Sequence, residues 1–182
     1  IEYEKQNIIN RIYKIDYKNR IYNIIGDKMI LDKINCPDDL DNLSTEELSA
    51  LSQEIRQCLI QKLSKTGGHV GSNLGVVELT VALHKVFHSP VDKILFDVSH
   101  QCYTHKILTG RKQAFLEEAH FQDVTGYSNP KESEHDFFPM GHTSTAISLA
   151  AGFMKSRDLR GGKENIIAVI GDASLDGGEA FE

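Results

Sequence analysis

The amino-acid sequence predicts an α/β fold, in which a doubly wound, mainly parallel sheet carries helices on both faces. Residues 93–99 (KILFDVS) and 165–172 (NIIAVIGD) are apolar runs with the length and composition of buried strands. The long segment between them is rich in helical patterns and in Gly and Pro stops. Such a segment is typical of the crossover between two parallel strands, and it therefore predicts the α/β class.

A long helix is expected to begin after Ser44. Ser44 and Glu47 have the spacing of a capping box, in which each side chain accepts a hydrogen bond from the backbone N–H group of the other residue. Apolar residues then recur every three or four positions and predict one buried stripe, formed by Leu48, Leu51, Ile55, Leu59 and Leu63. Gly67 and Gly68 are expected to end this helix.

A second helix is expected over residues 76–87, closed by Pro90. Its apolar residues are spaced for one buried face, formed by Val76, Leu79, Leu83 and Val86. Residues 100–110 predict a loop and a short helix, and residues 111–140 predict an ordered excursion rather than a linker. Residues 141–162 predict a further helix with a Gly stop. The final residues, 177–182, read as the first turn of another helix, so the sequence is expected to stop before its domain does.

The composition argues against several classes of protein. The formal net charge is −6 at pH 7, whereas a nucleic-acid-binding surface needs clustered Lys and Arg, so no nucleic-acid partner is expected. No stretch approaches the ~18 consecutive apolar residues of a transmembrane helix, and no signal peptide is visible. We therefore expect a cytoplasmic location and no membrane partner. The three cysteines are far apart, which predicts reduced thiols.

Residues 1–28 differ in composition from the rest of the chain. Twenty of these 28 positions are Ile, Tyr, Asn or Lys, which have A/T-rich codons. We hypothesise that Met29 is the native start and that residues 1–28 are a translated leader or non-native extension, which leaves residues 29–182 as part of one domain. The alternative is a mildly basic amphipathic helix. Mass spectrometry of the natural protein distinguishes the two interpretations, because peptides from residues 1–28 would contradict the leader hypothesis.

Asp172 directly follows the second apolar run. In a parallel sheet, ligands collect at the carboxyl ends of the strands, so this position presents a carboxylate to a binding edge on a rigid support. Mg²⁺ prefers oxygen ligands and usually keeps substrate phosphates in its shell, so Asp172 is a candidate metal ligand, one among several. The alternative is that Asp172 only caps the helix that follows.

Gly141, His142 and Thr143 precede the predicted helix of residues 141–162 and its run of small residues. Free N–H groups at a helix N-terminus attract anions such as pyrophosphate, so this loop is a candidate phosphate site. The alternative is ordinary N-capping of the helix by Thr143 or Ser144.

Three further loops carry candidate residues. His69 lies among the glycines of segment 67–71, whose missing side chains permit a ligand to approach the imidazole, and an imidazole can transfer protons near neutral pH. The alternative is a surface or hydrogen-bonding histidine. His100 and His105 are five residues apart, which suits neither one helical face nor a usual zinc spacing. The loop around Tyr127 is a candidate substrate-facing loop, with a solvated turn as the alternative.

Four segments, taken in order, resemble the 1-deoxy-D-xylulose-5-phosphate synthases, a thiamine-diphosphate family of the transketolase superfamily. They are SKTGGHVGSNLGVVELTVALH, ILFDVSHQCYTHKILTGR, SEHDFFPMGHTSTAIS and AVIGDASLDGGEAFE, and the resemblance covers nearly all of residues 29–182. The resemblance implies the pyrophosphate-binding domain of a thiamine-diphosphate-binding fold, truncated at the C-terminus. It also implies a transferase that condenses pyruvate with D-glyceraldehyde 3-phosphate, with loss of CO₂, to give 1-deoxy-D-xylulose 5-phosphate for isoprenoid, thiamine and pyridoxal phosphate biosynthesis.

The same resemblance implies roles for individual residues. His69 matches the family's catalytic histidine beside the thiazolium ring, and Ser72 is expected to face the same pocket. Asp172 matches the first Mg²⁺ ligand of the family. The cofactor-binding positions of the family match His100, Gly141, His142, Thr143, Ala173 and Ser174.

Two features depart from the family pattern. The metal-binding signature usually reads GDG, whereas this chain has Ala173, whose methyl group is tolerated only if the local φ is negative and no cofactor atom fills that space. The Asn of the signature and the glutamate that activates the aminopyrimidine are absent from this chain. The chain alone is therefore expected to bind the cofactor poorly and to be inactive, as the N-terminal part of an enzyme whose relatives form homodimers.

Two other functions stay open. One is a non-catalytic short homologue that acts as a binding or regulatory module, and reading the DNA beyond codon 182 separates it from an enzyme. The other is a different transketolase-type thiamine-diphosphate enzyme with another acceptor, which product analysis separates.

Overall fold

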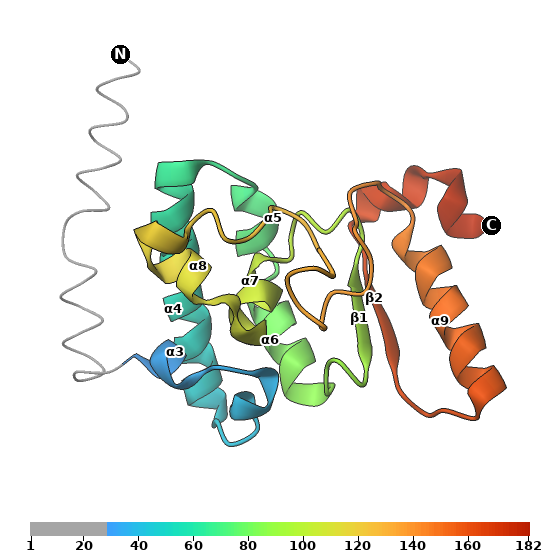
Figure 1. Cartoon of the computed structure of the whole chain (residues 1–182), viewed down its shortest axis with the longest axis horizontal. Helices are drawn as coiled ribbons and strands as arrows, with labels where there is room; N and C mark the ends of the chain where they lie inside the picture. Colours follow the sequence, from blue (N-terminus) through green and yellow to red (C-terminus); the bar gives the residue numbers. More distant parts are fainter. Residues whose placement is uncertain (1–28) are drawn as a thin grey trace, which may run out of the picture.

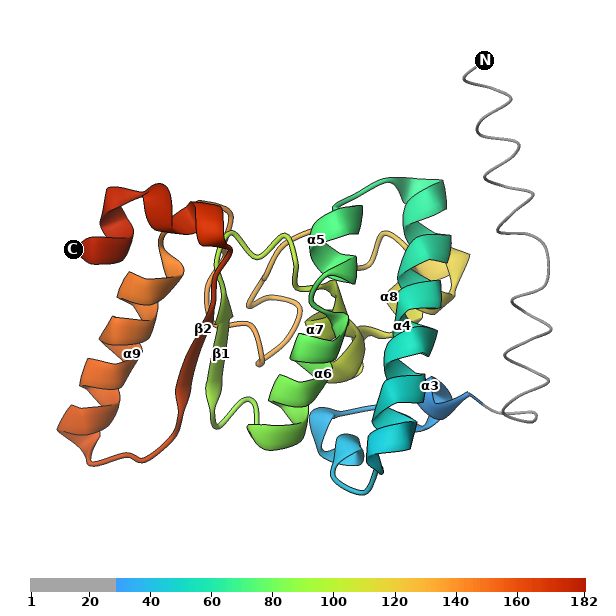
Figure 2. The ribbon, with the colours of Figure 1, turned by 180° about the vertical axis from the view of Figure 1, so that it is seen from behind.

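The computed structural model describes residues 29–182, and the leader hypothesis for residues 1–28 lies outside them. A two-stranded parallel sheet is flanked by helices in the described residues. The helix α9 (Ala146–Arg160) covers one face of the sheet, and α6 (Val77–Val86) and α7 (Tyr103–Lys106) lie on the other side (Figures 1 and 2). The predicted α/β class, with helices on both faces of a parallel sheet, is confirmed.

The sheet consists of β1 (Lys93–Phe96) and β2 (Ile166–Val169), paired in parallel with Lys93 opposite Ile166 and Phe96 opposite Val169. The last three residues of β1 are buried, whereas every residue of β2 is half-buried. The prediction of a fully buried second strand is therefore wrong. In the described part of the chain, β2 has a neighbouring strand on one side only, so its other edge and part of its surface stay accessible.

The long helix α4 (Thr45–Thr66) begins and ends as predicted. The Ser44 hydroxyl accepts a hydrogen bond from the Glu47 N–H group at 3.2 Å, and the Glu47 carboxylate accepts one from the Ser44 N–H group at 2.9 Å. Gly67 ends the helix with a φ of 71°, a left-handed conformation that favours glycine. The predicted stripe packs into the core, with Leu48 half-buried and the other four leucine and isoleucine side chains buried.

The buried face of α6 differs from the predicted one. Val77 and Val81 are buried, whereas Leu79 and Val86 are 48% and 63% exposed. The other two predicted residues, Val76 and Leu83, are half-buried, and Leu83 packs against the core. Both sets of residues have helical spacing, so periodicity alone does not decide which face packs. Because α6 packs against α4 and the 3-10 helix Pro37–Leu40, the face that carries Val77 and Val81 is covered.

The remaining elements are short. Residues 111–140, predicted as an ordered excursion, contain short helical turns joined by irregular segments. At the C-terminal end, residues 172–181 form two 3-10 turns instead of the predicted first turn of an α-helix. Among residues 29–182, no helix is both long enough and apolar enough to cross a bilayer. The short elements are α3 (Ile30–Lys33), α5 (Val70–Leu74), a π-helical turn (Ile107–Arg111), α8 (Gln113–Leu116) and the 3-10 helices Glu118–His120, Asp172–Asp176 and Gly178–Phe181.

A buried network of charged and imidazole groups fixes α7. The Asp136 carboxylate accepts hydrogen bonds from His105 Nε2 at 3.0 Å and from the Arg111 guanidinium at 2.8 and 3.0 Å. His105 Nδ1 lies 2.9 Å from His84 Nε2. Burial lowers the pKa of both histidines, and for His84 the neighbouring imidazole lowers it further. Burial would raise the pKa of Asp136, but the bonds from His105 and Arg111 hold it well below its usual value.

We predict that the folded chain loses stability as the pH falls below about 6.5. His84 and His105 stay neutral when folded, whereas unfolded histidines bind protons at their ordinary pKa of about 6.5, so acid favours the unfolded state. Below that pH each histidine costs up to about 1.4 kcal/mol per pH unit, until its lowered pKa is reached. Urea denaturation at a series of pH values between about 8 and 5 measures this slope.

The matched variants are His84→Gln and His120→Gln. His84→Gln is expected to reduce the pH slope of the unfolding free energy, because one buried imidazole is removed. His120 is exposed, and its hydrogen bond to Asp123 raises its pKa, so His120→Gln is not expected to reduce the slope. An unchanged slope in His84→Gln contradicts the role given to the network.

Candidate functional site

The turns that follow β1 and β2 lie side by side at one edge of the sheet. Asp97, directly after β1, donates its backbone N–H group to the carbonyl oxygen of Val169 at 2.8 Å. The turn after β2 passes through Gly171 into the 3-10 helix Asp172–Asp176. Because the two strands run in the same direction, their carboxyl ends meet here, where parallel sheets bind ligands.

The carboxylate of Asp97 caps the N-terminus of α9. It accepts hydrogen bonds from the N–H groups of Ser144 at 2.9 Å, Thr145 at 2.9 Å and Ala146 at 3.0 Å, and the residue is only 1% exposed. Burial alone would raise the pKa of this carboxyl group. The Ala146 N–H group, the Ser174 hydroxyl and the other two N–H groups nevertheless hold the pKa below its usual value. A charged cap therefore joins β1 to α9.

This cap changes what the start of α9 can bind. The first N–H groups of the helix were predicted either to attract a pyrophosphate or to be capped by Thr143 or Ser144. In the structure, Thr145 is the N-cap residue and makes no capping bond with its side chain. The Asp97 carboxylate, which comes from a distant part of the sequence, instead accepts from the N–H group of Ala146, the first helical residue, and from those of Ser144 and Thr145 just before it. These three N–H groups are therefore not free for a pyrophosphate, and the predicted capping by the side chain of Thr143 or Ser144 is wrong for them.

The loop before α9 nevertheless leaves room for a ligand. Gly141 and His142 are exposed and line an open hollow of about 520 Å³, together with Leu149 and Glu179. His142 Nδ1 lies 2.8 Å from the carbonyl oxygen of Thr143. A Cβ atom at Gly141 would meet no other atom within 4 Å. The space beside this glycine is therefore not used for packing within the described residues.

Ser174 fastens the turn after β2 to the start of α9. Its Oγ accepts a hydrogen bond from the Thr143 hydroxyl at 2.9 Å, and its carbonyl oxygen accepts one from the Ser144 hydroxyl at 2.5 Å. Ser144 also packs against Gly177, where a Cβ atom would overlap the Ser144 side chain. The loop before α9 and the turn after β2 therefore form one connected surface.

Asp172 is exposed at the beginning of the turn after β2. Its Oδ1 accepts a hydrogen bond from the Ala173 N–H group at 2.9 Å. Ala173 lies within a 3-10 helix and does not have a positive φ, so the backbone condition for its methyl group is met. Among residues 29–182, no group of three or more His, Cys, Asp and Glu side chains is arranged to hold a metal ion. The described residues thus offer Asp172 as a single carboxylate rather than a complete metal site.

His100, three residues after Asp97, lies beside His69. Their rings are 5.3 Å apart, edge to face. The ring of Tyr127 lies 5.5 Å from that of His69, and the Tyr103 hydroxyl lies 3.4 Å from His69 Nδ1. His69 and His100, two of the histidines that the sequence singles out, are therefore neighbours, and the loop of Tyr127 adjoins them.

Asn73, in α5, connects the backbones of the two histidines. Its amide nitrogen donates to the carbonyl oxygens of His69 and His100, both at 2.7 Å, and its amide oxygen accepts from the Tyr103 N–H group at 2.9 Å. Asn73 is fully buried, so these bonds have no competition from water. Ser72 is half-buried beside it and makes no side-chain hydrogen bond within residues 29–182.

The surroundings of His100 favour its neutral form and leave one nitrogen unpaired. Burial lowers the pKa of His100, and the neighbouring His69 lowers it further. Its Nδ1 atom is buried without a hydrogen-bond partner in the described part of the chain. An unpaired buried polar atom is costly, so this nitrogen fits a polar ligand group that would bond to it.

The backbone just before His100 is strained. Val98 and Ser99 have φ values of 58° and 70°, a left-handed conformation that is rare outside glycine and unfavourable for a β-branched residue. The Ser99 hydroxyl oxygen accepts a hydrogen bond from the Ser128 N–H group at 2.8 Å, so the strained turn also holds the loop of Tyr127. Strain of this kind persists at functional sites, where the surroundings impose it.

Comparison with known proteins decides the family. The sequence profile described as 1-deoxy-D-xylulose-5-phosphate synthase matches residues 31–182. The chain belongs to the 1-deoxy-D-xylulose-5-phosphate synthase family. The resemblance stated from the four sequence segments is thereby confirmed.

Curated 1-deoxy-D-xylulose-5-phosphate synthases from distant organisms align over most of the chain. The synthase of Caldanaerobacter subterraneus subsp. tengcongensis is 54% identical over 153 residues, which cover 84% of this chain and 25% of that protein. Synthase 1 of Geobacter sulfurreducens is 50% identical, with coverage of 84% and 24%. The chloroplastic synthase 1 of Oryza sativa subsp. japonica is 52% identical, with coverage of 84% and 21%. The chain thus spans about a quarter of the length of these synthases.

Within this member of the family, the structure places the predicted residues in two groups at the edge where β1 and β2 end. His69, Ser72 and His100 form the first group, around α5 and the turn after β1. The second group contains Asp172 and the residues Gly141, His142, Thr143, Ala173 and Ser174. Sequence reasoning missed Asp97, Asn73 and Tyr103. For Asp97 a signal existed, because it follows the first apolar run as Asp172 follows the second.

Proposed function

We propose that the chain is the N-terminal part of a transferase that makes 1-deoxy-D-xylulose 5-phosphate from pyruvate and D-glyceraldehyde 3-phosphate, with loss of CO₂. Its product would serve isoprenoid, thiamine and pyridoxal phosphate biosynthesis, and the whole protein would work as a cytoplasmic homodimer. The observation that carries the proposal is that the pair His69–His100 and the turn of Asp172 belong to the same edge of the sheet, where β1 and β2 end side by side. Because the chain spans about a quarter of its relatives, the reaction is proposed for the whole protein, and the chain alone is expected to be inactive.

The residues at this edge fit thiamine diphosphate. When bound, the cofactor supplies a carbanion and an electron sink that side chains lack. The unpaired Nδ1 atom of His100 offers a hydrogen bond to a phosphate oxygen when protonated. The exposed loop of Gly141, His142 and Thr143 would hold the diphosphate from the α9 side, and Ala173 and Ser174 would complete the binding surface.

Mg²⁺ would be held in part by Asp172. Its carboxylate is exposed and follows β2 on a rigid support, which suits a hard cation that also binds phosphate oxygens. Because the described residues hold no complete metal cluster, further ligands must come from the diphosphate and from other parts of the protein.

His69 is the proposed catalytic residue for proton transfer. It is half-buried at the start of α5, near Gly67 and Gly71, where a Cβ atom would meet no other atom within 4 Å, and its ring faces those of His100 and Tyr127. Histidine is the side chain that most often serves as general acid or base in enzymes. Ser72, one turn further on, would contribute its hydroxyl to the same pocket.

Product analysis of the whole protein tests the proposal. With pyruvate, D-glyceraldehyde 3-phosphate, thiamine diphosphate and Mg²⁺, we expect 1-deoxy-D-xylulose 5-phosphate and CO₂ in equal amounts, and neither when thiamine diphosphate is omitted. A different product with another acceptor points to another transketolase-type enzyme. Absence of both turnover and cofactor binding contradicts the proposal and favours a binding or regulatory module.

A further inference from the structure

The hydroxyl of Tyr103 occupies a narrow slot between two glycines and His69. A Cβ atom at Gly68 would lie 3.2 Å from this oxygen, and one at Gly126 would lie 3.3 Å from it. Both distances are shorter than ordinary contacts, so a side chain at either position would crowd the hydroxyl. The Tyr103 ring itself is anchored in the core, 5.7 Å from the ring of Phe115.

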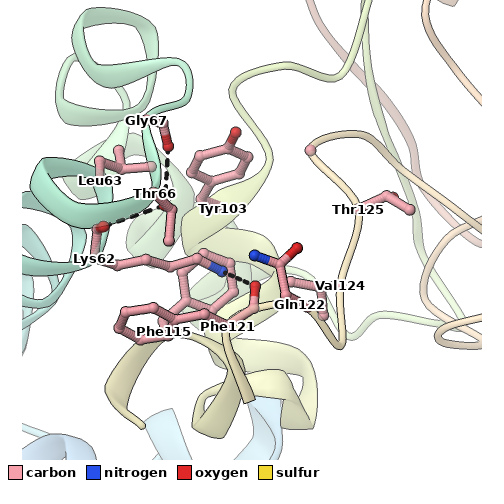
Figure 3. A pocket seen from close by; sticks show the side chains of 11 residues that line it. Lys62, Leu63, Thr66, Gly67, Tyr103, Phe115, Phe121, Gln122, Val124 and Thr125 are labelled. Atoms are coloured by element: carbon pink, nitrogen blue, oxygen red, sulfur yellow. Dashed lines mark hydrogen bonds between the residues drawn. The ribbon is translucent and has the colours of Figure 1, made fainter. Parts of the chain in front are cut away.

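The Tyr103 ring also lines a small cavity beside Lys62. In Figure 3 the Tyr103 oxygen points away from the Lys62 ammonium, which bonds to the carbonyl oxygens of Ala114 and Phe121 at 2.7 and 3.2 Å. The Lys62 ammonium therefore does not compete for the phenol oxygen.

His69 presents two groups to the Tyr103 oxygen. Its Nδ1 atom lies 3.4 Å from that oxygen, and its backbone N–H group is near enough to lower the pKa of the phenol. Burial raises the pKa of the Tyr103 phenol, and the backbone N–H group of His69 only partly offsets this, so the phenol keeps its proton at neutral pH. The protonated phenol therefore has its O–H bond to donate. Nδ1 is the acceptor within reach.

We propose that Tyr103 is a positioning residue that donates its hydroxyl proton to His69 Nδ1 and thereby keeps the proton of the neutral imidazole on Nε2. The proposal rests on the proposed function in that His69 is the proton carrier there. Nε2, on the far side of the ring from Nδ1, is then the nitrogen that exchanges a proton with a ligand. A hydrogen bond to one ring nitrogen sets the tautomer in this way.

Asn73 holds the backbones of His69 and Tyr103 in fixed positions relative to each other. Its amide oxygen accepts a hydrogen bond from the Tyr103 N–H group, and its amide nitrogen donates one to the His69 carbonyl oxygen. One buried side chain therefore fixes the backbones of both residues at 2.7 and 2.9 Å. The contact between the phenol and the imidazole is held by the fold and does not depend on a bound ligand.

Nitrogen NMR of the purified protein, labelled with ¹⁵N in its histidine rings, tests the proposal without cofactor or turnover. At about pH 8.5, above the ordinary imidazole pKa of about 6.5, the Nδ1 and Nε2 shifts report which nitrogen carries the proton. The His69 signals are assigned by their loss in His69→Gln. We expect the Nε2–H form to dominate in the unaltered protein. In Tyr103→Phe, the ratio of Nε2–H to Nδ1–H is expected to fall about fivefold, the equivalent of one neutral hydrogen bond.

Tyr127→Phe is the matched control. Its ring lies 5.5 Å from that of His69, but no hydrogen bond joins the two side chains in the described residues, so the same substitution should leave the tautomer ratio unchanged. A dominant Nδ1–H form in the unaltered protein overturns the proposal, whether or not Tyr103→Phe folds. An equal change in both variants also overturns it. Because the readout needs no cofactor, the proposal fails separately from the proposed function, which fails if cofactor binding and product are absent.

Discussion

Asp97→Ala is expected to lower the free energy of unfolding by about 3 kcal/mol or more. The substitution leaves the N–H groups of Ser144, Thr145 and Ala146 without their acceptor at a buried helix end. Loss of a helix cap costs about 1–2 kcal/mol, and each buried donor left unpaired adds about 1–3 kcal/mol unless water reaches it. Urea denaturation of the purified protein, with circular dichroism as the signal, measures the difference.

Two further variants separate the cap from a general charge effect. Asp97→Asn keeps one acceptor oxygen but removes the charge, so we expect an intermediate loss. Asp172→Ala removes an exposed carboxylate that bonds only to the N–H group of the next residue, and it should change stability by less than about 0.5 kcal/mol. Equal stability of Asp97→Ala and Asp172→Ala contradicts the role of Asp97 as the connection between β1 and α9.

His69→Ala is expected to lower kcat of the whole protein by about 10²–10⁴-fold, the usual contribution of a positioned general acid or base. The affinity for thiamine diphosphate should change by less than about threefold, because the imidazole is proposed to move a proton rather than to hold the diphosphate. Steady-state kinetics with pyruvate and D-glyceraldehyde 3-phosphate, at a series of cofactor concentrations, separates the two effects.

His120→Ala is the control for this prediction. His120 is an exposed histidine outside the candidate site, so its loss should leave kcat and cofactor affinity unchanged. A normal kcat in His69→Ala, or an equal loss in both variants, would remove His69 from the proposed mechanism.

Features that depend on neighbouring residues in the sequence could be predicted. The capping box of Ser44 and Glu47 fixes the start of α4, and the left-handed Gly67 fixes its end, because both act within one turn of the helix. The two apolar runs mark β1 and β2, and their carboxyl ends locate the edge where the candidate residues meet. The family resemblance was also available from the sequence alone.

Features that depend on contacts between distant residues could not be predicted. The start of α9 was expected to have free N–H groups, but Asp97, nearly fifty residues earlier in the chain, accepts from the first of them and from the two N–H groups just before the helix. The predicted face of α6 was only partly right, because packing against α4 and the 3-10 helix Pro37–Leu40 decides which apolar residues are covered. Asn73 joins His69 to His100 only after α5 is packed against the turn that follows β1.

The central claim is that the turns at the carboxyl ends of β1 and β2 form one site for a magnesium-bound diphosphate. Titration of thiamine diphosphate into the whole protein, in the presence of Mg²⁺, tests it most directly when Asp172→Ala and His69→Ala are compared with the unaltered protein. The account predicts at least about a tenfold loss of Mg²⁺-dependent affinity in Asp172→Ala, equivalent to about 1.4 kcal/mol, and little change in His69→Ala. Unchanged affinity in Asp172→Ala, or the same loss in both variants, would contradict it.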